Sequence, residues 1–562
     1  MTLMKWKMLP SVPTEHLSRY SPSVPPLLAQ LLYNRGITDP ADSEVFLAAD
    51  KRLENDPFIL PGIREAVARI KHAVQDGETI AVFGDFDADG VTSSAVLVQG
   101  IKQIGGKAIP YIPHRVDEGH GLNMPALHKL KAQGVTLVIT VDCGITANSE
   151  AKQVKGMGMD LIINDHHEVV GEVPEALVVI DPKIDNSPYP FRELAGVGVA
   201  FKLLQALFQE HGIGDQADTF LDLVALGTVA DMVPLVGENR YLVNRGLQIL
   251  NETNRPGITA MLDCSGRATG QIDADTISFA LAPRLNAAGR LDHASISYDL
   301  LMTDSPKEAR DLANRLEMRN AERQRLTSQF MMMAEDKLSP IDPDIPLMMV
   351  ADEGFHAGVN GVVAGKLTDK YYRPAIIVEM GEKEGNGSAR SIAEFNLVKA
   401  LTECSELLTQ YGGHARAAGF MTPRENIDTL HQRLLAIAKR ELTGMDLQPN
   451  INIGAEIPIS SMSDETFKLI KMLEPCGQAN TAPTFLSRGV RVVQSRQVGS
   501  DGEHLKLKLG DRGVLWDAIG FGLNHLNGDN APLIDIVYNL KLNRWRGQES
   551  LQLELLDFTP SI

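Results

Sequence analysis

The chain has 562 residues, of which 44% are hydrophobic and 22% are charged, so it is too long for one hydrophobic core and too apolar to be disordered. On length alone we expect roughly three or four folded domains. The formal net charge of −18 favours small ligands over nucleic acid, but bound cations would cancel part of it, so charge neither supports nor excludes a nucleic-acid substrate.

The first 55 residues are rich in proline and then helical in pattern, and a regular alternation of strands and helices follows them. This alternation is typical of a doubly wound parallel sheet, in which ligands bind beyond the carboxyl ends of the strands. The predicted strands are Thr79–Gly84, Lys107–Pro110, Thr136–Val141 and Asp160–Asn164, and the predicted helices are Thr92–Ile104, Met124–Gln133 and Thr146–Gly156.

Acidic residues follow three of these strands directly. The run Asp85–Asp89 holds three alternating acids after the first strand, Asp142 follows the third, and Asp165–His167 reads Asp-His-His after the fourth. Carboxylates this close repel one another unless a cation neutralises them, and the set mixes carboxylate with imidazole. We therefore expect a Mn²⁺ or Mg²⁺ site at one edge of the sheet. The alternative for the first cluster is an acidic turn that caps a helix.

The second half of the chain predicts three further parts. Helical pattern dominates from Leu194 to about Leu301, and Ser305-Pro306 then opens a helix without glycine that is expected to end at Leu338. A second α/β region follows, and short β-type runs at the C-terminal end predict a small barrel. Its strands are expected at Val490–Val493, Leu505–Leu509, Ile534–Leu540 and Ser550–Leu555, and those of the α/β region near Pro346–Ala351 and Pro374–Glu379.

Recognisable sequence motifs follow one another over nearly the whole chain after residue 55. They are Val82–Thr92, Ile112–Arg115 with Glu118–Leu122, Asp142, Asp165–His167, Leu226–Leu235, Pro283–Arg290, Gly412–Gly419 and Leu473–Asn480. Together these motifs resemble the DHH phosphoesterase superfamily and, within it, the RecJ family of single-strand-specific 5′→3′ exonucleases. Gly412–Gly419 is similar to the signature of the associated DHHA1 domain, and Leu473–Asn480 resembles the entry to a C-terminal OB domain.

The resemblance implies an α/β protein with a DHH-type parallel-sheet domain, a long connecting helix, a DHHA1 α/β domain and a C-terminal OB-type β-barrel. The expected boundaries are an N-terminal segment at 1–55, the DHH catalytic domain with a helical extension at 56–304, the connecting helix at 305–338, the DHHA1 substrate-binding domain at 339–447 and the OB-fold single-strand-binding domain at 448–562.

The same resemblance implies two divalent cations, Mn²⁺ or Mg²⁺. The metal ligands it implies are Asp85, Asp87, Asp89, Asp142, His166 and Asp231, and the catalytic residues are His167, Asp142 and Asp85. Asp142 is the expected bridge between two ions about 3.5–4 Å apart, which would generate a hydroxide and stabilise the attacking and leaving oxygens. His167 would stabilise charge on phosphorus or protonate the leaving alkoxide. Whether Asp85 and His167 bind metal or orient other groups stays open.

A further set of residues is expected to bind the 5′-phosphate and the DNA strand. The set consists of Arg115, Arg284, Arg290, Ser388, Arg390, His414, Lys506, Lys508 and Trp545. Guanidinium groups match phosphate oxygens bidentately, and an aromatic side chain can stack on a base. The alternatives are structural ion pairs for the arginines, a plain tight turn for His414 and a solvated strand edge for the lysines.

Three positions depart from the pattern of the family. Cys143 stands where asparagine is expected, His120 where tyrosine is usual, and Asn360 where an aliphatic residue is usual. None of the three removes a predicted metal ligand, so activity remains the expectation.

The predicted function is Mn²⁺- or Mg²⁺-dependent degradation of single-stranded DNA from its 5′ end to 5′-mononucleotides. Family resemblance implies a role in DNA recombination and repair, with a single-strand-binding protein and a helicase as partners, and a monomer is expected. The four cysteines form no C-x-x-C pair, and no apolar run of 18 residues or signal-peptide pattern occurs, so we expect a cytoplasmic protein without a membrane partner.

Two other functions compete with this prediction. One is a phosphoesterase for small substrates, such as an oligoribonuclease, a cyclic-dinucleotide phosphodiesterase or a pyrophosphatase, which would not need the C-terminal barrel. The other is a non-catalytic binding scaffold, which would not need to retain the acids and the two histidines.

Overall fold

A computed structural model describes residues 4–20, 24–115, 117–169, 171–342, 344–499, 502–523, 532–545 and 548–561. Contacts divide the chain into two compact units, which are described separately. Unit 1 comprises Asn55–Val233 and Arg245–Pro449, and unit 2 comprises Met4–Glu54, Pro234–Asn244 and Asn450–Ile562. The domain boundaries expected from the sequence remain a prediction, but the N-terminal segment shares unit 2 with the C-terminal region.

The first sheet of unit 1 is parallel, as predicted. Its strands run in the order β3, β2, β4, β5, β6. Buried apolar side chains on both faces of β2 and β4 explain why these strands read as continuous hydrophobic runs. The strands are β2 (Thr79–Gly84), β3 (Lys107–Tyr111), β4 (Val135–Val141), β5 (Asp160–Asn164) and β6 (Val178–Ile180).

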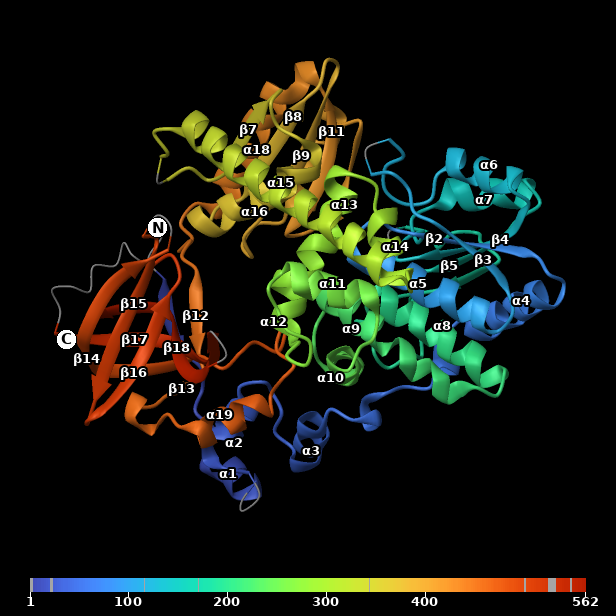
Figure 1. Cartoon of the computed structure of the whole chain (residues 1–562). Coiled ribbons are helices and arrows are strands. Elements are labelled where there is room, and N and C mark those ends of the chain that lie inside the picture. Colours follow the sequence, from blue (N-terminus) through green and yellow to red (C-terminus); the bar gives the residue numbers. More distant parts are fainter. Residues whose placement is uncertain are drawn as a thin grey trace. The chain divides into compact units, whose positions relative to one another are not determined.

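Helices cover both faces of this sheet (Figure 1). Side chains of α6 and α7 share one hydrophobic cluster with β2, β4 and β5. On α5, Gly100 permits the close approach of α8, since a Cβ there would lie 2.1 Å from a methyl group of Leu204. The helices are α4 (Ile63–Gln75), α5 (Ala88–Gln103), α6 (Met124–Ala132), α7 (Asn148–Gly156) and α8 (Gly196–Glu210), and a short 3₁₀ turn spans Pro57–Ile59.

A helical region follows the sheet. It contains α9 (Leu221–Ala230), α10 (Gly237–Asn251), α11 (Pro256–Cys264), α12 (Ala274–Thr276), a π-helical turn (Ile277–Leu281), α13 (Ala282–Leu291) and α14 (Ser295–Met302), with a 3₁₀ turn at Gly214–Phe220. The long helix α15 (Pro306–Leu338) confirms the predicted connecting helix. Ser305 caps it by accepting a hydrogen bond from the backbone N–H of Glu308, and Pro306 occupies its first turn. Side chains of α15 pack against α16, beside the second sheet.

The second sheet of unit 1 is mixed, in the order β10, β11, β9, β8, β7. Strands β7 (Met348–Asp352) and β8 (Ala375–Met380) are parallel, whereas β9 (Glu384–Arg390), β10 (Gln410–His414) and β11 (Ala417–Pro423) add antiparallel pairings. The helices are α16 (Ala357–Tyr371), α17 (Leu397–Thr402) and α18 (Ile427–Leu442), with 3₁₀ turns at Ser405–Leu407 and Arg424–Asn426.

Unit 2 contains a closed five-stranded barrel, as predicted. The strands follow the order β14, β15, β16, β18, β17, and β14 pairs with β17 to close the barrel. The sequence prediction missed β16 and shortened the other four. The strands are β14 (Phe485–Val498), β15 (His504–Asp511), β16 (Val514–Gly520), β17 (Leu533–Trp545) and β18 (Gln548–Pro560).

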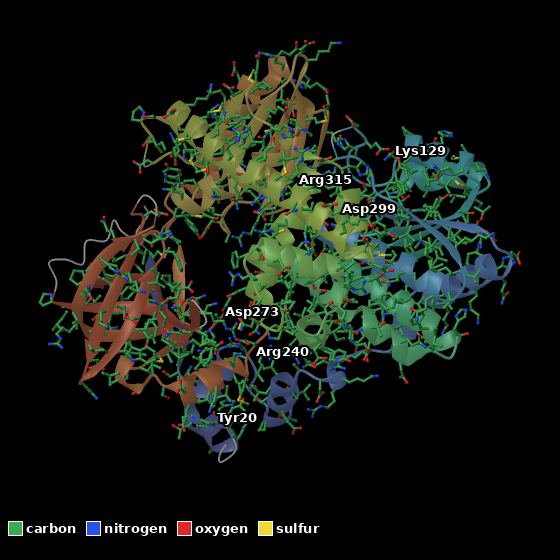
Figure 2. The ribbon with its side chains drawn as sticks, viewed as in Figure 1. Tyr20, Lys129, Arg240, Asp273, Asp299 and Arg315 are labelled. Carbon is green, nitrogen blue, oxygen red and sulfur yellow. The ribbon has the colours of Figure 1, made fainter. Side chains whose placement is uncertain are left out.

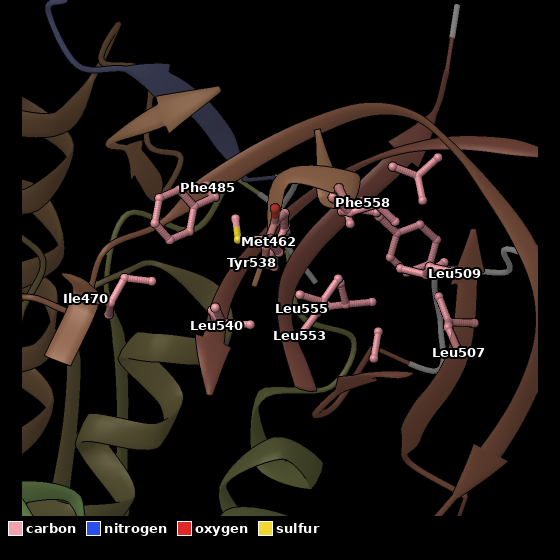
Figure 3. Packing of buried hydrophobic residues seen from close by; sticks show 14 of the residues in the cluster. Met462, Ile470, Phe485, Leu507, Leu509, Tyr538, Leu540, Leu553, Leu555 and Phe558 are labelled. Atoms are coloured by element: carbon pink, nitrogen blue, oxygen red, sulfur yellow. The ribbon is translucent and has the colours of Figure 1, made fainter. Parts of the chain in front are cut away.

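The N-terminal residues complete the core of unit 2. The buried side chains Phe485, Leu507, Tyr538 and Leu555 pack together in the barrel (Figure 3), and Leu28 from α2 belongs to the same cluster. Further elements are β1 (Lys5–Met8), α1 (Thr14–Tyr20), α2 (Pro26–Tyr33), α3 (Pro40–Ala48), a 3₁₀ turn at Lys51–Leu53, β12 (Asn450–Ile453), β13 (Ala455–Glu456), a 3₁₀ turn at Ile459–Ser461 and α19 (Asp464–Lys471).

Arg240 of unit 2, labelled in Figure 2, carries a positive charge that is buried. Arg240 is 0% exposed, and its guanidinium carbon lies 3.9 Å from the centre of the Phe46 ring. The guanidinium donates hydrogen bonds to the backbone carbonyls of Phe46, Met472 and Leu473 at 2.8, 3.2 and 2.9 Å. The protein itself therefore supplies this cation with a nearly complete set of acceptors. None of the described helices is both long and apolar enough to span a membrane.

Candidate active site

Acidic and histidine side chains converge at the carboxyl edge of the parallel sheet in unit 1. They come from the ends of β2, β4 and β5 and from the end of α9. Three sets have ligand atoms within 4.8 Å of one another: Asp142 with His166 and His167, Asp89 with His166 and Asp231, and Asp85 with Asp87 and Asp142. The structure thus brings together all seven residues that the sequence predicted for metal binding and catalysis.

His166 is oriented toward the acids by the backbone. Its Nδ1 lies 3.1 Å from the carbonyl oxygen of Leu194, so this nitrogen is the donor and Nε2 is left as the acceptor. Nε2 lies 3.0 Å from Oδ1 of Asp142 and 3.7 Å from Oδ2 of Asp231, yet it is buried without a hydrogen bond. An imidazole nitrogen with a lone pair among carboxylates is suited to bind a cation.

Asp165 orients the double-histidine segment. Its carboxylate accepts hydrogen bonds from the backbone N–H groups of Ile145 and His166, at 2.9 and 2.7 Å, and lies 2.8 Å from Nδ1 of His167. Burial alone would raise the pKa of Asp165, but the interaction with His167 lowers it to about 2. The same contact raises the pKa of His167 to about 9 against the effect of burial. Because Nδ1 of His167 faces Asp165, Nε2 is the ring nitrogen left to contact a ligand.

Asp87 and Asp89 are fixed by backbone N–H groups. Asp87 caps α5 by accepting from the N–H groups of Asp89 and Gly90, so the helix-capping alternative and the metal-binding prediction describe the same side chain. Asp89 accepts hydrogen bonds from the backbone N–H groups of Gly196 and Val197, at 2.7 and 2.8 Å. A Cβ at Gly196 would lie 2.7 Å from Cβ of Asp142, so only glycine permits this approach.

The site would be electrostatically unfavourable without a cation. Burial raises the pKa of Asp142 well above its usual value, and the neighbouring carboxylates raise it further. Burial and Asp87 raise the pKa of Asp89 to about 7, and burial lowers that of His166 to about 3. Asp142 also has a φ of 60°, in the left-handed region that non-glycine residues rarely adopt. Carboxylate oxygens, an imidazole nitrogen and the buried Oδ1 of Asp85, which lacks a hydrogen bond, fit Mn²⁺ or Mg²⁺.

Arginine side chains form a second cluster, next to the acids. Arg115 lies over the ring of Phe86, 5.0 Å from its centre, and Nη1 of Arg290 donates to the carbonyl of Gly358 at 3.2 Å. Burial and the positive charges of Arg115, Arg323 and Arg390 together lower the pKa of Arg290 to about 9. These four guanidinium groups therefore repel one another. Such a cluster is suited to bind an anion.

Sequence reasoning missed Arg323 in this cluster. It lies on α15, where many charged residues follow one another, and no local signal separates it from its neighbours. Arg390 was predicted, and Gly361 leaves room for it, since a Cβ there would lie 3.2 Å from Nη2. Ser388 lies two residues earlier on β9, so it shares a face of the strand with Arg390.

Arg284 has its own partners, as the structural alternative anticipated. Its Nε lies 2.5 Å from Oε2 of Glu317, and Nη1 donates to the carbonyl of Ala280. His414 lies on β10, and burial and the positive charge of His167 lower its pKa.

The residues predicted for DNA binding in the barrel lie on its outer surface or outside the described side chains. Lys506 and Lys508 alternate along β15 with buried leucines, and they lie opposite Arg496 and Gln494 on β14. The backbone of Trp545 ends β17, but its side chain is outside the described residues.

The three departures from the family pattern lie in different surroundings. Cys143 is buried in the core behind the sheet edge, its Sγ is 3.8 Å from the carbonyl of Phe83, and burial raises its pKa. The ring of His120 is 4.3 Å from that of Phe86, and its Nδ1 is 3.8 Å from Oδ1 of Asp85. Asn360 is 0% exposed, and neither atom of its amide has a hydrogen-bond partner.

Comparison with known proteins gives consistent matches along the chain. Family models match at residues 79–228 (DHH family, N-terminal domain), 344–440 (DHHA1 domain) and 453–557 (RecJ OB domain). The chain is 38% identical over 538 residues to the single-stranded-DNA-specific exonuclease RecJ of Bacillus subtilis, covering 95% of this chain and 68% of the relative. It is 33% identical over 563 residues to the Escherichia coli protein of that name, covering 96% of each.

Solved structures give the same result. RecJ from Thermus thermophilus in complex with Mn²⁺ superposes with a TM-score of 0.85 at 31% identity, covering 99% of this chain and 79% of that one. The Mg²⁺ complex of the same protein superposes with a TM-score of 0.79 at 30% identity, covering 99% and 78%.

Proposed function

Because this chain belongs to the RecJ family of single-stranded-DNA-specific exonucleases, we propose that it is a metal-dependent hydrolase that degrades single-stranded DNA from the 5′ end. Each turnover would release one 5′-mononucleotide. The observation that carries this proposal is the convergence of buried acids and His166 beside a cluster of arginines. An anionic substrate can be held by the arginines while its phosphodiester is presented to the metal-binding residues.

We propose two divalent cations, Mn²⁺ or Mg²⁺. The sets Asp89 with His166 and Asp231, and Asp85 with Asp87 and Asp142, would each hold one ion. Asp142 also lies within reach of His166, which supports a bridging role for its carboxylate. When bound, such ions supply an activated water and neutralise charge on the attacking and leaving oxygens.

The protein side chains would position the groups that react. Asp165 holds His167 through Nδ1, so that the Nε2 N–H can donate to the phosphate under attack or to the leaving 3′ oxygen. The backbone N–H groups of Gly196 and Val197 keep Asp89 in place without using a cation. The strained backbone of Asp142 is compatible with a carboxylate that is held in one geometry for metal binding.

We propose that Arg115, Ser388 and Arg390 bind the 5′-phosphate, with Arg290 and Arg323 completing the positive field. Arg284, whose guanidinium is paired with Glu317, would add positive charge near Arg323 without binding the phosphate itself. His414 would contact the phosphodiester beside His167. A pocket that binds the 5′-phosphate next to the metals would explain why degradation proceeds from the 5′ end and why its product is a mononucleotide.

The proposal is tested with a single strand labelled at either end, a blunt duplex and a dinucleotide, each with Mn²⁺. Early release of the labelled 5′-mononucleotide, with the duplex intact, is the expected result. Rapid cleavage of the dinucleotide alone would favour the small-substrate alternative, and no hydrolysis of any substrate would favour the scaffold.

A second test concerns the 5′-phosphate pocket. Wild-type enzyme should prefer a 5′-phosphorylated strand to a 5′-hydroxyl strand, and Arg390→Met should abolish that preference. Arg440→Met, which removes an exposed arginine that is paired with Glu403, should retain it. Equal preference in all three proteins would exclude Arg390 from recognition of the 5′ end.

The C-terminal barrel, which matches the RecJ OB domain, would hold the downstream strand through Lys506, Lys508 and Trp545. The resemblance further supports a monomeric cytoplasmic enzyme of DNA recombination and repair that works with a single-strand-binding protein and a helicase. Lys506→Met combined with Lys508→Met should weaken the degradation of long strands much more than that of dinucleotides.

A further inference from the structure

One acidic side chain in the loop between β3 and α6 has no role in the mechanism above. The described residues of this loop, 112–115 and 117–123, form no helix or strand. Glu118 lies in the loop and is partly buried. Both oxygens of its carboxylate accept a hydrogen bond, one from the hydroxyl of Tyr111 at 2.5 Å and one from the backbone N–H of His114 at 2.6 Å. Hydrogen bonds this short are typical of an ionised acceptor.

Tyr111 is the last residue of β3, and the sheet fixes its position. It pairs with Phe83 of β2, and the two rings are stacked with their centres 5.2 Å apart and an angle of 18° between their planes. Nζ of Lys129, on α6, lies 5.2 Å from the centre of the Tyr111 ring. The hydroxyl that donates to Glu118 is therefore held by the sheet and by α6, and not by the loop.

Glu118 also fixes the backbone of His114 on both sides. The N–H of His114 donates to Oε2 of Glu118, and the carbonyl oxygen of His114 accepts from the backbone N–H of Glu118 at 2.8 Å. Each peptide unit is planar, so the two bonds orient the peptide before His114 and the peptide that leads into Arg115. The direction in which the chain enters Arg115 thus depends on Glu118.

Arg115 reaches the metal-binding segment from this position. Its guanidinium carbon lies 5.0 Å from the centre of the ring of Phe86, which stands in the sequence between Asp85 and Asp87. Phe86 is 2% exposed, so the ring on which the guanidinium rests is part of the core. A guanidinium stacked on a fixed ring has its N–H groups directed sideways, where they can meet an anion.

The contact between Glu118 and Tyr111 keeps its charge and its proton in place. Burial would raise the pKa of Glu118, but the hydrogen bonds from Tyr111 and from the N–H of His114 lower it below its usual value. Burial and the Glu118 carboxylate raise the pKa of Tyr111, so its hydroxyl remains a donor. Near neutral pH, the carboxylate therefore keeps both of its hydrogen bonds.

We propose that Glu118 is a positioning residue for the 5′ end of the substrate. Through the backbone of His114 it holds Arg115 on Phe86, where the guanidinium binds the 5′-phosphate. The inference rests on the proposed function and assigns the preference for a phosphorylated end in part to Glu118. The alternative is that Glu118 only stabilises the loop, which would change the melting temperature but not the preference between two kinds of 5′ end.

The test compares kcat/KM, with Mn²⁺, for two strands that differ only in a 5′-phosphate or a 5′-hydroxyl. Glu118→Ala should lower the preference for the phosphorylated strand by about 10-fold, because a guanidinium displaced by about 1 Å loses much of a charge-assisted contact. Glu118→Gln keeps an acceptor for the N–H of His114, and its amide can donate to the oxygen of Tyr111, so it should retain most of the preference. The ratio of the two kcat/KM values does not depend on the fraction of enzyme that is folded, so partial unfolding of a variant cannot imitate the expected result.

A double-mutant cycle tests whether Glu118 acts through Arg115. The preference of Arg115→Met and that of the double variant Arg115→Met with Glu118→Ala should agree within about 2-fold. Additive losses of preference in the double variant would overturn the proposal.

Glu335→Ala is the matched control. It removes a carboxylate that accepts a hydrogen bond from the hydroxyl of Tyr371 at 2.9 Å and pairs with Lys370, and it should keep the wild-type preference. A preference in Glu118→Ala equal to that of Glu335→Ala would overturn the proposal. Wild-type enzyme without activity on either strand would instead contradict the proposed function, and wild-type activity without any preference would contradict the 5′-phosphate pocket together with this inference.

Discussion

The surroundings of Arg240 in unit 2 and the acidic site in unit 1 both bury charge, and they differ in whether the protein satisfies that charge. Arg240 in unit 2 is 0% exposed and donates hydrogen bonds to a ring of carbonyl groups. Asp142 and His166 in unit 1 are 4% and 5% exposed, but they face further acids, and Nε2 of His166 has no hydrogen bond. A buried charge with complete protein partners stabilises the fold, whereas one with incomplete partners marks a place for a ligand.

Removal of the Asp142 carboxylate from the metal site should have the largest effect on activity. Asp142→Asn keeps the shape of the side chain but removes the proposed bridging charge, so turnover should fall by about 10³-fold or more. Without metal, the melting temperature of the variant should equal or exceed that of wild-type protein, because one of several mutually repelling acids is gone. Mononucleotide release and thermal unfolding in EDTA measure the two quantities. A strongly lowered melting temperature would indicate that Asp142 stabilises the fold.

Arg240→Met should have the opposite effects, a loss of stability with little change in turnover. The substitution leaves several buried carbonyls without a donor, so the free energy of unfolding of unit 2 should fall by about 3 kcal/mol. Urea unfolding followed by tryptophan fluorescence measures the loss. Arg19→Met, which removes an exposed arginine from α1 in the same unit, is the control and should change the free energy by less than about 0.5 kcal/mol. Equal stability of the two variants would show that the hydrogen bonds of Arg240 do not stabilise unit 2.

Addition of metal should stabilise unit 1, where the buried acids and His166 lack protein partners, and not unit 2. Mn²⁺ at 100 times its dissociation constant should add about 2.7 kcal/mol to the free energy of unfolding of unit 1, since the ion binds only the folded site. The same addition to Asp142→Asn should give a smaller increase, and Arg240→Met should respond as wild-type protein does. Calorimetric scans with and without Mn²⁺ distinguish these cases.

Substitution of two buried asparagines should change the free energy of unfolding least, and in opposite directions. Asn480 is 1% exposed, and its amide accepts from Arg35 and donates to Leu473 and Pro475, whereas the amide of Asn360 has no partner. Asn360→Leu should therefore raise the free energy of unfolding by about 1 kcal/mol, and Asn480→Leu should lower it by about 2 kcal/mol. A loss of stability in Asn360→Leu would show that its amide is satisfied in solution, for instance by a bound water.

Much of the fold could be predicted because its signals are local. The strands of the first sheet are apolar on both faces, and α15 begins at Ser305-Pro306 and runs without glycine to Leu338. The acids of the metal site were also predictable, because the carboxyl ends of parallel strands meet at one edge. Only Ala518 and Gly520 of β16 are buried, so its sequence lacks a clear hydrophobic alternation, and the prediction missed it.

What the sequence did not reveal depends on contacts between distant segments. Arg323 joins the arginine cluster only because α15 lies against α13, and Arg284 leaves it because Glu317 lies within reach. The packing of α2 into the barrel core likewise has no signal in the first 55 residues. Hydrophobic periodicity shows which face of an element is buried, but not which segment buries it.

Unit 2 combines N-terminal and C-terminal segments, so its parts are synthesised at different times. Strand β1 pairs with β12, and Trp6 donates a hydrogen bond to Asp557, which is 551 residues later. A nascent chain leaves the ribosome from its N-terminus, so residues 4–54 emerge before almost all of unit 1 and long before their partners. All of unit 1 can fold during translation, while the apolar face of α2 stays uncovered until the last strands of the barrel are released. Chaperones that shield hydrophobic segments during synthesis should therefore bind α2 more often than any helix of unit 1.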